Sequence, residues 1–304
     1  MQPGFTVSVI VSENLTKYYG RTVGVRDLTL RVPEGEVFGF LGPNGSGKTT
    51  TIRVLVGLLR PTGGNARIFG LDTWRDSHRV KVDVGYLPGD LRLYHWLTAR
   101  SAFEVVGRIR GRDLTSNGRR LADMFDLDLD VRVRTMSRGT RQKLGLVLAL
   151  VHEPKLLILD EPTSGLDPIM QERLKDHIRG LASRGHTVFF SSHSLSEVQH
   201  VCDRVAIVRN GRLVAHESLD TLRGRAMREV SIRWHTARAA DVPIAPDFLE
   251  VHHRMDRQWQ CALHGSVPEL IRWIAGKPVA DLSIGQPDLD SVFRRYYDEE
   301  AVEP

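Results

Sequence analysis

A glycine-rich segment that ends in lysine and threonine is the first feature of the chain that could do chemistry. Residues 42–49 read GPNGSGKT and satisfy the pattern G-x-x-x-x-G-K-[ST]. In such a loop, glycines let successive backbone N–H groups point inward around an anion, and the following helix adds a positive dipole end. Lys48 would reach the β- and γ-phosphates as a point charge, and the Thr49 hydroxyl would ligate Mg²⁺. The residues predicted to bind phosphate are Gly42, Pro43, Asn44, Gly45, Ser46, Gly47, Lys48 and Thr49.

Two adjacent carboxylates end an apolar run farther along the chain. Residues 156–161 read LLILDE, and ligands of a parallel sheet bind at the carboxyl ends of its strands. Asp160 suits the shell of Mg²⁺, directly or through water. Glu161 suits a base that orients and deprotonates an attacking water. Alone, a strand that ends in Asp-Glu often just begins a solvated loop, but beside the glycine-rich segment it favours hydrolysis of a nucleotide phosphate.

A histidine follows another apolar run, TVFFSS at residues 187–192. A lone histidine after a strand is more often a surface or helix-capping residue. At the edge of the same inferred site, His193 could contact the γ-phosphate or hold the water and Glu161 in line.

The spacing of apolar residues predicts the elements that must position these side chains. Apolar and polar residues alternate over 6–11 and 25–32, as in half-buried strands, whereas Val37–Leu41 is typical of a buried strand. From Lys48 to Leu59 the apolar spacing is helical. The glycine-rich segment therefore lies between a strand and a helix, as its pattern requires. Without that context, chance would produce the pattern in roughly one chain of this length in a hundred.

The later segments predict an α/β architecture. Residues 90–150 are expected to be mostly helical. A helix at Ile169–Ala182 separates buried strands at Leu156–Leu159 and Thr187–Ser191. Strand, helix and strand in this order imply a parallel sheet with helices on its faces.

The last third of the chain begins with a hairpin signal, Asn210-Gly211, within RVAIVRNGRLVAH at 204–216. The tail, residues 226–304, is expected to be a small α+β domain. Its strands are expected at Val230–Trp234, Leu249–His253, Trp259–Leu263 and Val279–Ile284, and its helices at Val267–Ala275 and Leu289–Tyr297.

The charge of the chain changes sign near residue 225. The tail carries 9 Lys and Arg against 13 Asp and Glu, a net charge of −4, whereas the rest carries +9. We therefore expect two domains, 1–225 and 226–304. The basic surface of the first could face nucleic acid, anionic lipid or an acidic partner, or could simply be a solvated arginine-rich surface.

The composition is that of an ordinary soluble globular protein, with 41% hydrophobic and 26% charged residues among 304. Two cysteines are too few for a disulfide framework and favour a reducing cytoplasm. The longest apolar candidate, Leu144–Val151, falls short of the ~20 residues that a membrane-spanning helix needs. Residues 1–12 lack a charged start and do not have the pattern of a signal peptide. Work at a membrane would therefore need a partner.

Taken together, these motifs resemble the nucleotide-binding domain of ABC transporters over about residues 8–222. Residues 136–143 (MSRGTRQK) are similar to the family signature LSGGQ, and residues 164–167 (SGLD) to its D-loop. His193 falls at the position of the switch histidine, and Tyr19 at that of the aromatic residue that stacks on adenine. The resemblance implies a P-loop NTPase parallel-sheet core with an antiparallel β subdomain and a helical subdomain.

The resemblance also implies ATP hydrolysis with ATP and Mg²⁺ as cofactors. In the family, two domains pair head to tail, each signature closes over the partner's ATP, and hydrolysis releases the pair. The implied catalytic residues are Glu161, His193 and Lys48, and the implied metal ligands are Thr49 and Asp160. Besides the glycine-rich segment, the implied nucleotide-binding residues are Tyr19, Thr50, Ser137, Gly139 and Asp167.

Two positions depart from the family pattern. Arg138 replaces a glycine of the signature, while Ser137 and Gly139 keep its two contact positions. Gly89 stands where the family has a glutamine that ligates Mg²⁺ and senses the γ-phosphate. Gly89 has no side chain for either task, so Asp90 is the candidate substitute and turnover could be slow.

Residues 287–293 (PDLDSVF) are similar to the ending of subunits that serve ABC-2 type exporters. This implies a peripheral subunit on the cytoplasmic face of the cell membrane. Its implied partners are a second nucleotide-binding subunit, expected to be another copy of the chain, and separate membrane-spanning permease subunits.

Two other classes of function compete with a transport ATPase. A soluble ABC ATPase acting on nucleic acid or ribosomes would usually carry two nucleotide domains or long coiled coils, so no nucleic acid is expected. A nucleotide-gated switch that hardly hydrolyses ATP is suggested by Gly89, but a pure switch does not need Glu161 and His193.

Overall fold

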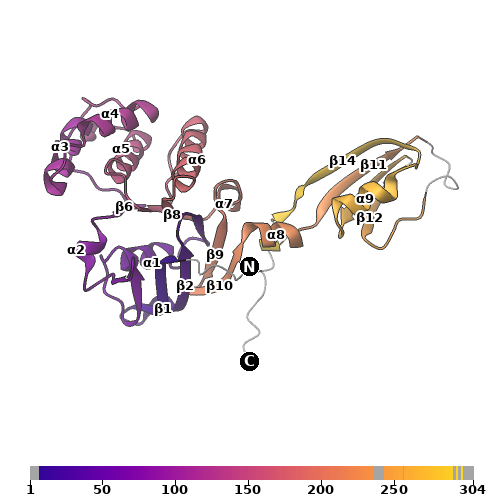
Figure 1. The fold of residues 1–304 in the computed structure, drawn as a ribbon, viewed down its shortest axis with the longest axis horizontal. Coiled ribbons are helices and arrows are strands. Elements are labelled where there is room, and N and C mark those ends of the chain that lie inside the picture. Colours follow the sequence, from indigo (N-terminus) through magenta and orange to yellow (C-terminus); the bar gives the residue numbers. More distant parts are fainter. Residues whose placement is uncertain (1–6, 236–242, 256, 290–291, 294–295, 297–304) are drawn as a thin grey trace. The chain divides into compact units, whose positions relative to one another are not determined.

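The computed structural model describes residues 7–235, 243–255, 257–289, 292–293 and 296. The chain divides into two compact units, Met1–Leu219 and Asp220–Pro304, each of which is described by itself (Figure 1). The division between the units falls at the start of helix α8 (Leu219–Arg225), whereas the boundary that the charge pattern predicts, after residue 225, lies at the C-terminal end of that helix.

The core of the first unit is a six-stranded sheet with the strand order β10-β9-β3-β8-β7-β6. Five of these strands are parallel neighbours, and β10 closes the sheet as the antiparallel arm of a hairpin. Asn210 and Gly211 form its turn with φ values of 50° and 77°, which confirms the predicted hairpin. The strands are β3 (Val37–Leu41), β6 (Val84–Leu87), β7 (Leu156–Asp160), β8 (Thr187–Ser192), β9 (Arg204–Arg209) and β10 (Arg212–Ser218).

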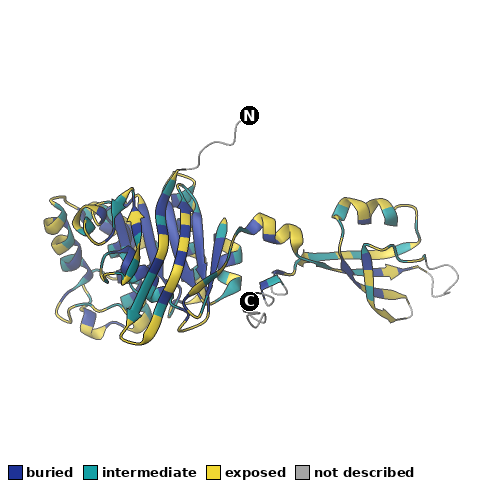
Figure 2. Ribbon diagram, turned by 90° about the horizontal axis from the view of Figure 1, so that it is seen from below, coloured by how far each residue is buried: buried dark blue, intermediate teal, exposed yellow. Residues whose placement is uncertain are grey.

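Three of these strands, β3, β7 and β8, are buried along their whole length, and Figure 2 shows strands coloured as buried inside the first unit. A parallel sheet is covered on both faces, so its central strands need continuous apolar runs rather than alternation. The parallel arrangement predicted from the strand–helix–strand order is therefore confirmed.

A second, antiparallel sheet has the order β2-β1-β4-β5. Its inward side chains share one apolar core with the large sheet, which includes Leu28, Phe38 and Phe189. Helix α1 (Lys48–Leu55) contacts strands of both sheets. The strands are β1 (Ser8–Tyr19), β2 (Thr22–Pro33), β4 (Gly63–Ile68) and β5 (Leu71–Asp72).

Helix α1 is shorter than predicted, because it ends at Leu55 and not at Leu59. Gly57 has a φ of 66°, and a Cβ there would lie 2.4 Å from the carbonyl oxygen of Thr73. The chain turns at this glycine to pass close to another backbone segment, which apolar spacing does not reveal.

A helical region follows β6, and its helices α3, α4 and α5 contact one another (Figure 1). Thr98 begins α3 with a complete capping box, and Ser137 begins α5 by accepting a hydrogen bond from Thr140 N. Helix α5 also contacts β6, which ties this region to the large sheet. The helices of the first unit besides α1 are α2 (Ser77–Val80), α3 (Ala99–Arg110), α4 (Thr115–Met124), η1 (Val133–Thr135), α5 (Arg138–Leu150), α6 (Pro168–Ala182) and α7 (Leu195–Val201).

The second unit is a four-stranded antiparallel sheet, β12-β13-β11-β14, with helix α9 (Val267–Ile274) packed on one face. Trp234, Trp259 and Leu270 belong to its own apolar core. The strands are β11 (Arg228–Trp234), β12 (Leu249–Met255), β13 (Gln258–Leu263) and β14 (Val279–Pro287). The predicted helix Leu289–Tyr297 falls largely outside the described residues.

These elements confirm the predicted fold class, an α/β P-loop NTPase core with an antiparallel sheet, a helical region and a small α+β unit after it. Among the described residues, no helix is both long enough and apolar enough to cross a membrane.

Candidate nucleotide-binding and hydrolysis site

The phosphate loop, residues 42–49, connects β3 to α1 at the carboxyl edge of the large sheet. Gly47 begins α1 with a φ of 102°, and a Cβ there would lie 2.4 Å from the carbonyl oxygen of Gly24. A Cβ at Gly42 would lie 2.4 Å from the carbonyl oxygen of Val208. Both positions therefore require glycine, because neighbouring backbone occupies the space of a side chain.

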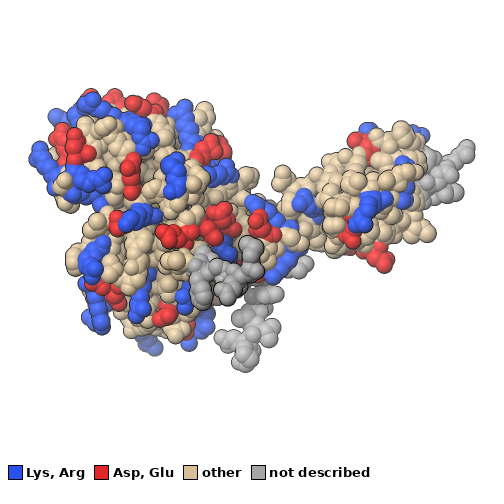
Figure 3. Space-filling view, in the orientation of Figure 1, with Lys and Arg blue, Asp and Glu red and all other residues tan. Residues whose placement is uncertain are grey.

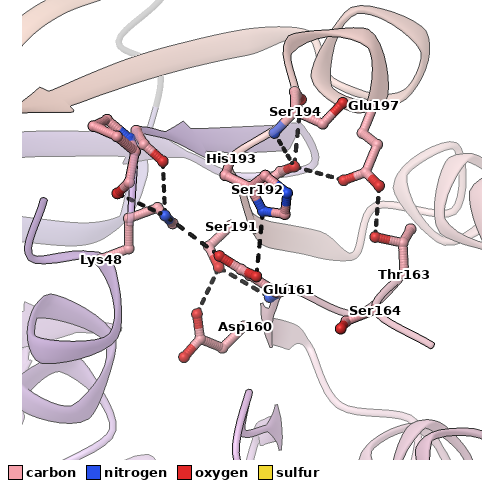
Figure 4. A network of polar contacts seen from close by, with 12 residues as sticks. Lys48, Asp160, Glu161, Thr163, Ser164, Ser191, Ser192, His193, Ser194 and Glu197 are labelled. Atoms are coloured by element: carbon pink, nitrogen blue, oxygen red, sulfur yellow. Dashed lines mark hydrogen bonds and ion pairs between the residues drawn. The ribbon is translucent and has the colours of Figure 1, made fainter. Parts of the chain in front are cut away.

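Lys48 is only 5% exposed and lies along the inside of the loop. Its Nζ donates to the carbonyl oxygens of Gly42 at 2.7 Å and Pro43 at 3.2 Å. The same Nζ lies 3.4 Å from Glu161 Oε1, as Figure 4 shows. A buried ammonium at this place gives the loop the positive charge that a phosphate needs.

Thr49 and Asp160 meet although 111 residues separate them, because the Thr49 hydroxyl donates to Asp160 Oδ2 at 2.9 Å. Asp160 Oδ1 accepts a hydrogen bond of 2.7 Å from Ser191 Oγ. Burial raises the pKa of the Tyr86 phenol to about 12, and the charge of the nearby Asp160 carboxylate contributes to this rise. A hydroxyl and a carboxylate are the hard oxygen donors that suit Mg²⁺, which usually keeps several waters in its shell.

Glu161 is held between two basic side chains from different elements. It has a φ of 50°, and its backbone N–H donates to Ser191 Oγ at 3.0 Å. Its Oε1 faces Lys48, and its Oε2 lies 3.3 Å from His193 Nδ1 (Figure 4). Glu161 is 28% exposed and His193 is 57% exposed, so a water can reach both.

A cavity of about 270 Å³ lies over the phosphate loop. Tyr19 lines it from the end of β1, with Lys17 Nζ 5.6 Å from the centre of its ring. Ser46 Oγ is buried without a hydrogen-bond partner among the described residues, which fits a loop that bonds a ligand. The residues that line the cavity are Tyr19, Thr22, Val23, Gly24, Asn44, Gly45, Gly47, Lys48, Thr49, Thr50 and Glu161.

Gly42, Pro43 and Ser46 belong to the phosphate loop but do not line this cavity. The predicted nucleotide-binding residues far from that loop in sequence, Ser137, Gly139 and Asp167, do not line it either. The start of α5, with Ser137 and Gly139, packs against the segment 162–167 that ends at Asp167, since a Cβ at Gly139 would lie 2.6 Å from the carbonyl oxygen of Gly165. Ser137 and Asp167 cap α5 and α6 by accepting hydrogen bonds of 3.0 Å from the N–H groups of Thr140 and Met170. Within one chain, the structure thus separates the predicted site residues into two groups.

The two departures from the family pattern lie in different surroundings. A Cβ at Gly89 would lie 3.3 Å from Asp160 Oδ2, so position 89 borders the candidate metal ligand. The side chain of Asp90 is 63% exposed and pairs with Arg92 at 2.9 Å. Arg138 donates to Ser164 Oγ at 2.7 Å and so joins the start of α5 to residues 162–167.

Sequence reasoning missed two residues that hold this site together, Ser191 and Glu197. Ser191 joins Asp160 to the backbone of Glu161, and Glu197 bonds residues on both sides of the site. The signal for Ser191 was available, because a hydroxyl near the end of an otherwise apolar strand needs a polar partner. Glu197 gave no such signal, since a glutamate in the first turn of a helix is ordinary.

The comparisons with known proteins all indicate the same family. The ABC transporter family matches residues 25–164. The bacitracin transport ATP-binding protein BcrA of Bacillus licheniformis is 38% identical over 221 residues, which cover 72% of this chain and 72% of the relative. An uncharacterized ABC transporter ATP-binding protein of Synechocystis, sll0415, is 30% identical over 99% of this chain and 88% of its own length.

Solved structures agree with this result. The structure of an ATP-binding subunit of an ABC transporter superposes with a TM-score of 0.66 and 29% identity, covering 71% of this chain and 92% of its own. A dimeric bacterial ABC transporter cassette, MJ0796, has a TM-score of 0.62 at 22% identity over 69% of this chain and 98% of its own, and shares the fold.

The chain therefore belongs to the family of ABC transporter ATP-binding proteins. It is an ATPase, the ATP-binding subunit of an ABC transporter.

Proposed function

We propose that this subunit hydrolyses MgATP between two copies of the chain and thereby drives export through a separate membrane-spanning permease. The observation that carries the proposal is the meeting of Lys48, Thr49, Asp160, Glu161 and His193 at one edge of the sheet. Export is supported by the two relatives named for bacitracin transport, of which the second, from Enterococcus faecalis, is 34% identical.

In the proposed reaction, each residue at the phosphate loop has one task. Lys48 and the loop backbone bind the β- and γ-phosphates, and Tyr19 stacks on the adenine. Thr49 and Asp160 hold Mg²⁺, which when bound neutralises charge on the phosphates. Glu161 orients the attacking water and takes its proton on a carboxylate oxygen. His193 Nδ1 lies 3.3 Å from Glu161 Oε2 and would keep that carboxylate pointed at the water.

The second group of residues completes the site in a dimer. Ser137 and Gly139 begin α5, where free backbone N–H groups and the helix dipole favour an anion, and no cavity-lining residue of the same chain lies in this group. A head-to-tail pair would bring Ser137, Gly139 and Asp167 of one copy over the ATP of the other. The bacterial ABC transporter cassette MJ0796 has been solved as a dimer.

We further propose that the dimer works on the cytoplasmic face of the cell membrane beneath ABC-2 type permease subunits. The resemblance of residues 287–293 to the ending of subunits that serve such exporters supports this assignment. Lys and Arg side chains are interspersed with Asp and Glu over the face of the first unit in Figure 3. The face drawn there is therefore not the continuous basic surface that nucleic acid needs.

Replacing Glu161 with glutamine tests the proposal. Glu161→Gln removes the base but keeps the size of the side chain, so it should still bind MgATP and accumulate as a stable dimer. Size-exclusion chromatography with and without MgATP measures this, with Glu172→Gln, an exposed residue of α6, as the matched control. A variant that stays monomeric with saturating MgATP would contradict the dimer, and one with full ATPase activity would contradict the role of Glu161.

A further inference from the structure

One carboxylate outside the cavity joins the two loops that carry Glu161 and His193. Glu197 lies in the first turn of α7. Its Oε1 accepts a hydrogen bond of 2.7 Å from Thr163 Oγ1, and its Oε2 accepts one of 2.5 Å from Ser192 Oγ. Thr163 follows Glu161 by two residues, and Ser192 directly precedes His193. Figure 4 shows the Glu197 side chain reaching toward both hydroxyls.

The burial of the two hydroxyls makes this bridge specific. Thr163 is 5% exposed and Ser192 is 1% exposed, so neither can exchange the carboxylate for bulk water. Hydrogen bonds to an ionised acceptor are shorter and roughly twice as strong as neutral ones. Ser192 Oγ also accepts the N–H of Ser194 at 2.8 Å, so the backbone turn around His193 belongs to the same network.

The loop after β7 is also tied to α5 on its other side. Gln142 Nε2 donates to the carbonyl oxygen of Pro162 at 3.1 Å, and Arg138 donates to Ser164 Oγ at 2.7 Å. Thr163 lies between these two anchor points. Its bond to Glu197 therefore connects the loop held by α5 to the end of β8, which His193 directly follows.

We infer that Glu197 is a positioning residue for ATP hydrolysis, which fixes His193 against Glu161 by joining Thr163 to Ser192. The inference rests on the roles proposed above for Glu161 and His193. Glu197 does not line the cavity, so it would act on the rate of the chemical step and not on nucleotide affinity. Displacing a catalytic group by about 1 Å can cost about 100-fold in rate.

Glutamine at this position separates a positioning role from a need for charge. In Glu197→Gln, the new amide oxygen can accept from Thr163 while the amide NH₂ group donates to Ser192 Oγ. The Ser192 hydroxyl then turns to the carbonyl oxygen of Ser194, which already lies 3.3 Å away. Alanine at the same position removes both bonds.

The test compares kcat and MgATP affinity in the purified full chain for Glu197→Ala, Glu197→Gln and, as a surface control on α6, Glu172→Ala. Glu197→Ala should lower kcat about tenfold or more with an unchanged dissociation constant for MgATP, while Glu197→Gln and the control keep the wild-type rate. In a His193→Ala background, Glu197→Ala should not lower kcat further, because both substitutions act on the contact between His193 and Glu161.

Two results would overturn the inference. One is a wild-type kcat for Glu197→Ala. If Glu161→Gln is inactive in the same assay, the proposed function still holds and only the role of Glu197 is wrong. The other is an equal, independent loss in the His193→Ala background, which indicates general destabilisation. An active Glu161→Gln would instead sink the proposed function itself. If Glu197→Ala does not fold, Thr163→Val and Ser192→Ala each remove one of the two hydrogen bonds to Glu197, and Ser192→Ala also removes the contacts of Ser192 Oγ with Ser194. Both variants are judged by the same kcat and affinity criteria.

Discussion

At the scale of single residues, the backbone of Glu161 has a conformation that is uncommon for a residue with a side chain. Its φ of 50° lies in the left-handed region, which costs a residue with a Cβ about 1–2 kcal/mol. The hydrogen bond from its N–H to Ser191 and the contacts of its carboxylate with Lys48 and His193 offset this cost. Strain held in this way at a functional site directs the side chain toward the phosphate loop.

The contacts of Lys48 predict a large effect on nucleotide affinity. Lys48→Met keeps the apolar stem but removes the ammonium, and a hydrogen bond to a charged group contributes about 1.5–3 kcal/mol. The dissociation constant for ATP should therefore rise about 10- to 100-fold, which isothermal titration calorimetry measures. Lys175→Met, on α6, serves as the control and should bind normally. Unchanged binding by Lys48→Met would rule out its contact with phosphate.

At the scale of elements, two helices begin at residues that the family resemblance assigns to nucleotide binding. Ser137 caps α5, and Asp167 caps α6 with Pro168 at the first helical position. Both caps fix the backbone where α5 meets residues 162–167. A residue can serve as a cap in its own chain and still present its remaining atoms to a partner.

The cap of α6 predicts how substitutions of Asp167 affect stability. Asp167→Ala should lower the free energy of unfolding by about 1 kcal/mol, which corresponds to about 2–4 °C in Tm. Asp167→Ser should keep most of the wild-type stability, because serine is a good cap. Thermal unfolding without nucleotide measures both. A serine variant as unstable as the alanine variant would mean that the carboxylate stabilises the fold by something other than capping.

At the scale of the whole molecule, each unit has an apolar core of its own. The tryptophans of the two units differ in how far they are buried. Trp234, Trp259 and Trp273 pack together in the second unit with edge-to-face contacts, whereas Trp74 and Trp96 of the first are 42% and 66% exposed. Tryptophan emission therefore reports mainly on the second unit, and far-UV circular dichroism mainly on the helix-rich first.

This division predicts that MgATP stabilises the two units differently. A ligand at 100 times its dissociation constant adds about 2.7 kcal/mol to the unit that binds it. The transition followed by circular dichroism should move to higher temperature with MgATP, while the tryptophan transition should not. Lys48→Met should abolish the shift. If both probes move together, the two units unfold as one cooperative body.

The sequence by itself determined the features that are local. The phosphate loop, the buried strands, the turn at Asn210-Gly211 and the two carboxylates at the end of β7 were predictable, because glycine geometry, apolar runs and strand ends act over a few residues. The family resemblance also pointed to both groups of site residues. The predicted end of α1 was wrong, because a distant backbone segment at Gly57 and not the local pattern ends that helix.

Tertiary structure alone decided which of these residues meet. The order β3-β8-β7 places the carboxyl ends of three strands side by side, and chain order does not show which strands become neighbours. That order brings Asp160 to Thr49 and His193 to Glu161, and it lets Glu197 span two loops. Sequence could name the chemical groups, whereas their distances depend on packing between segments far apart in the chain.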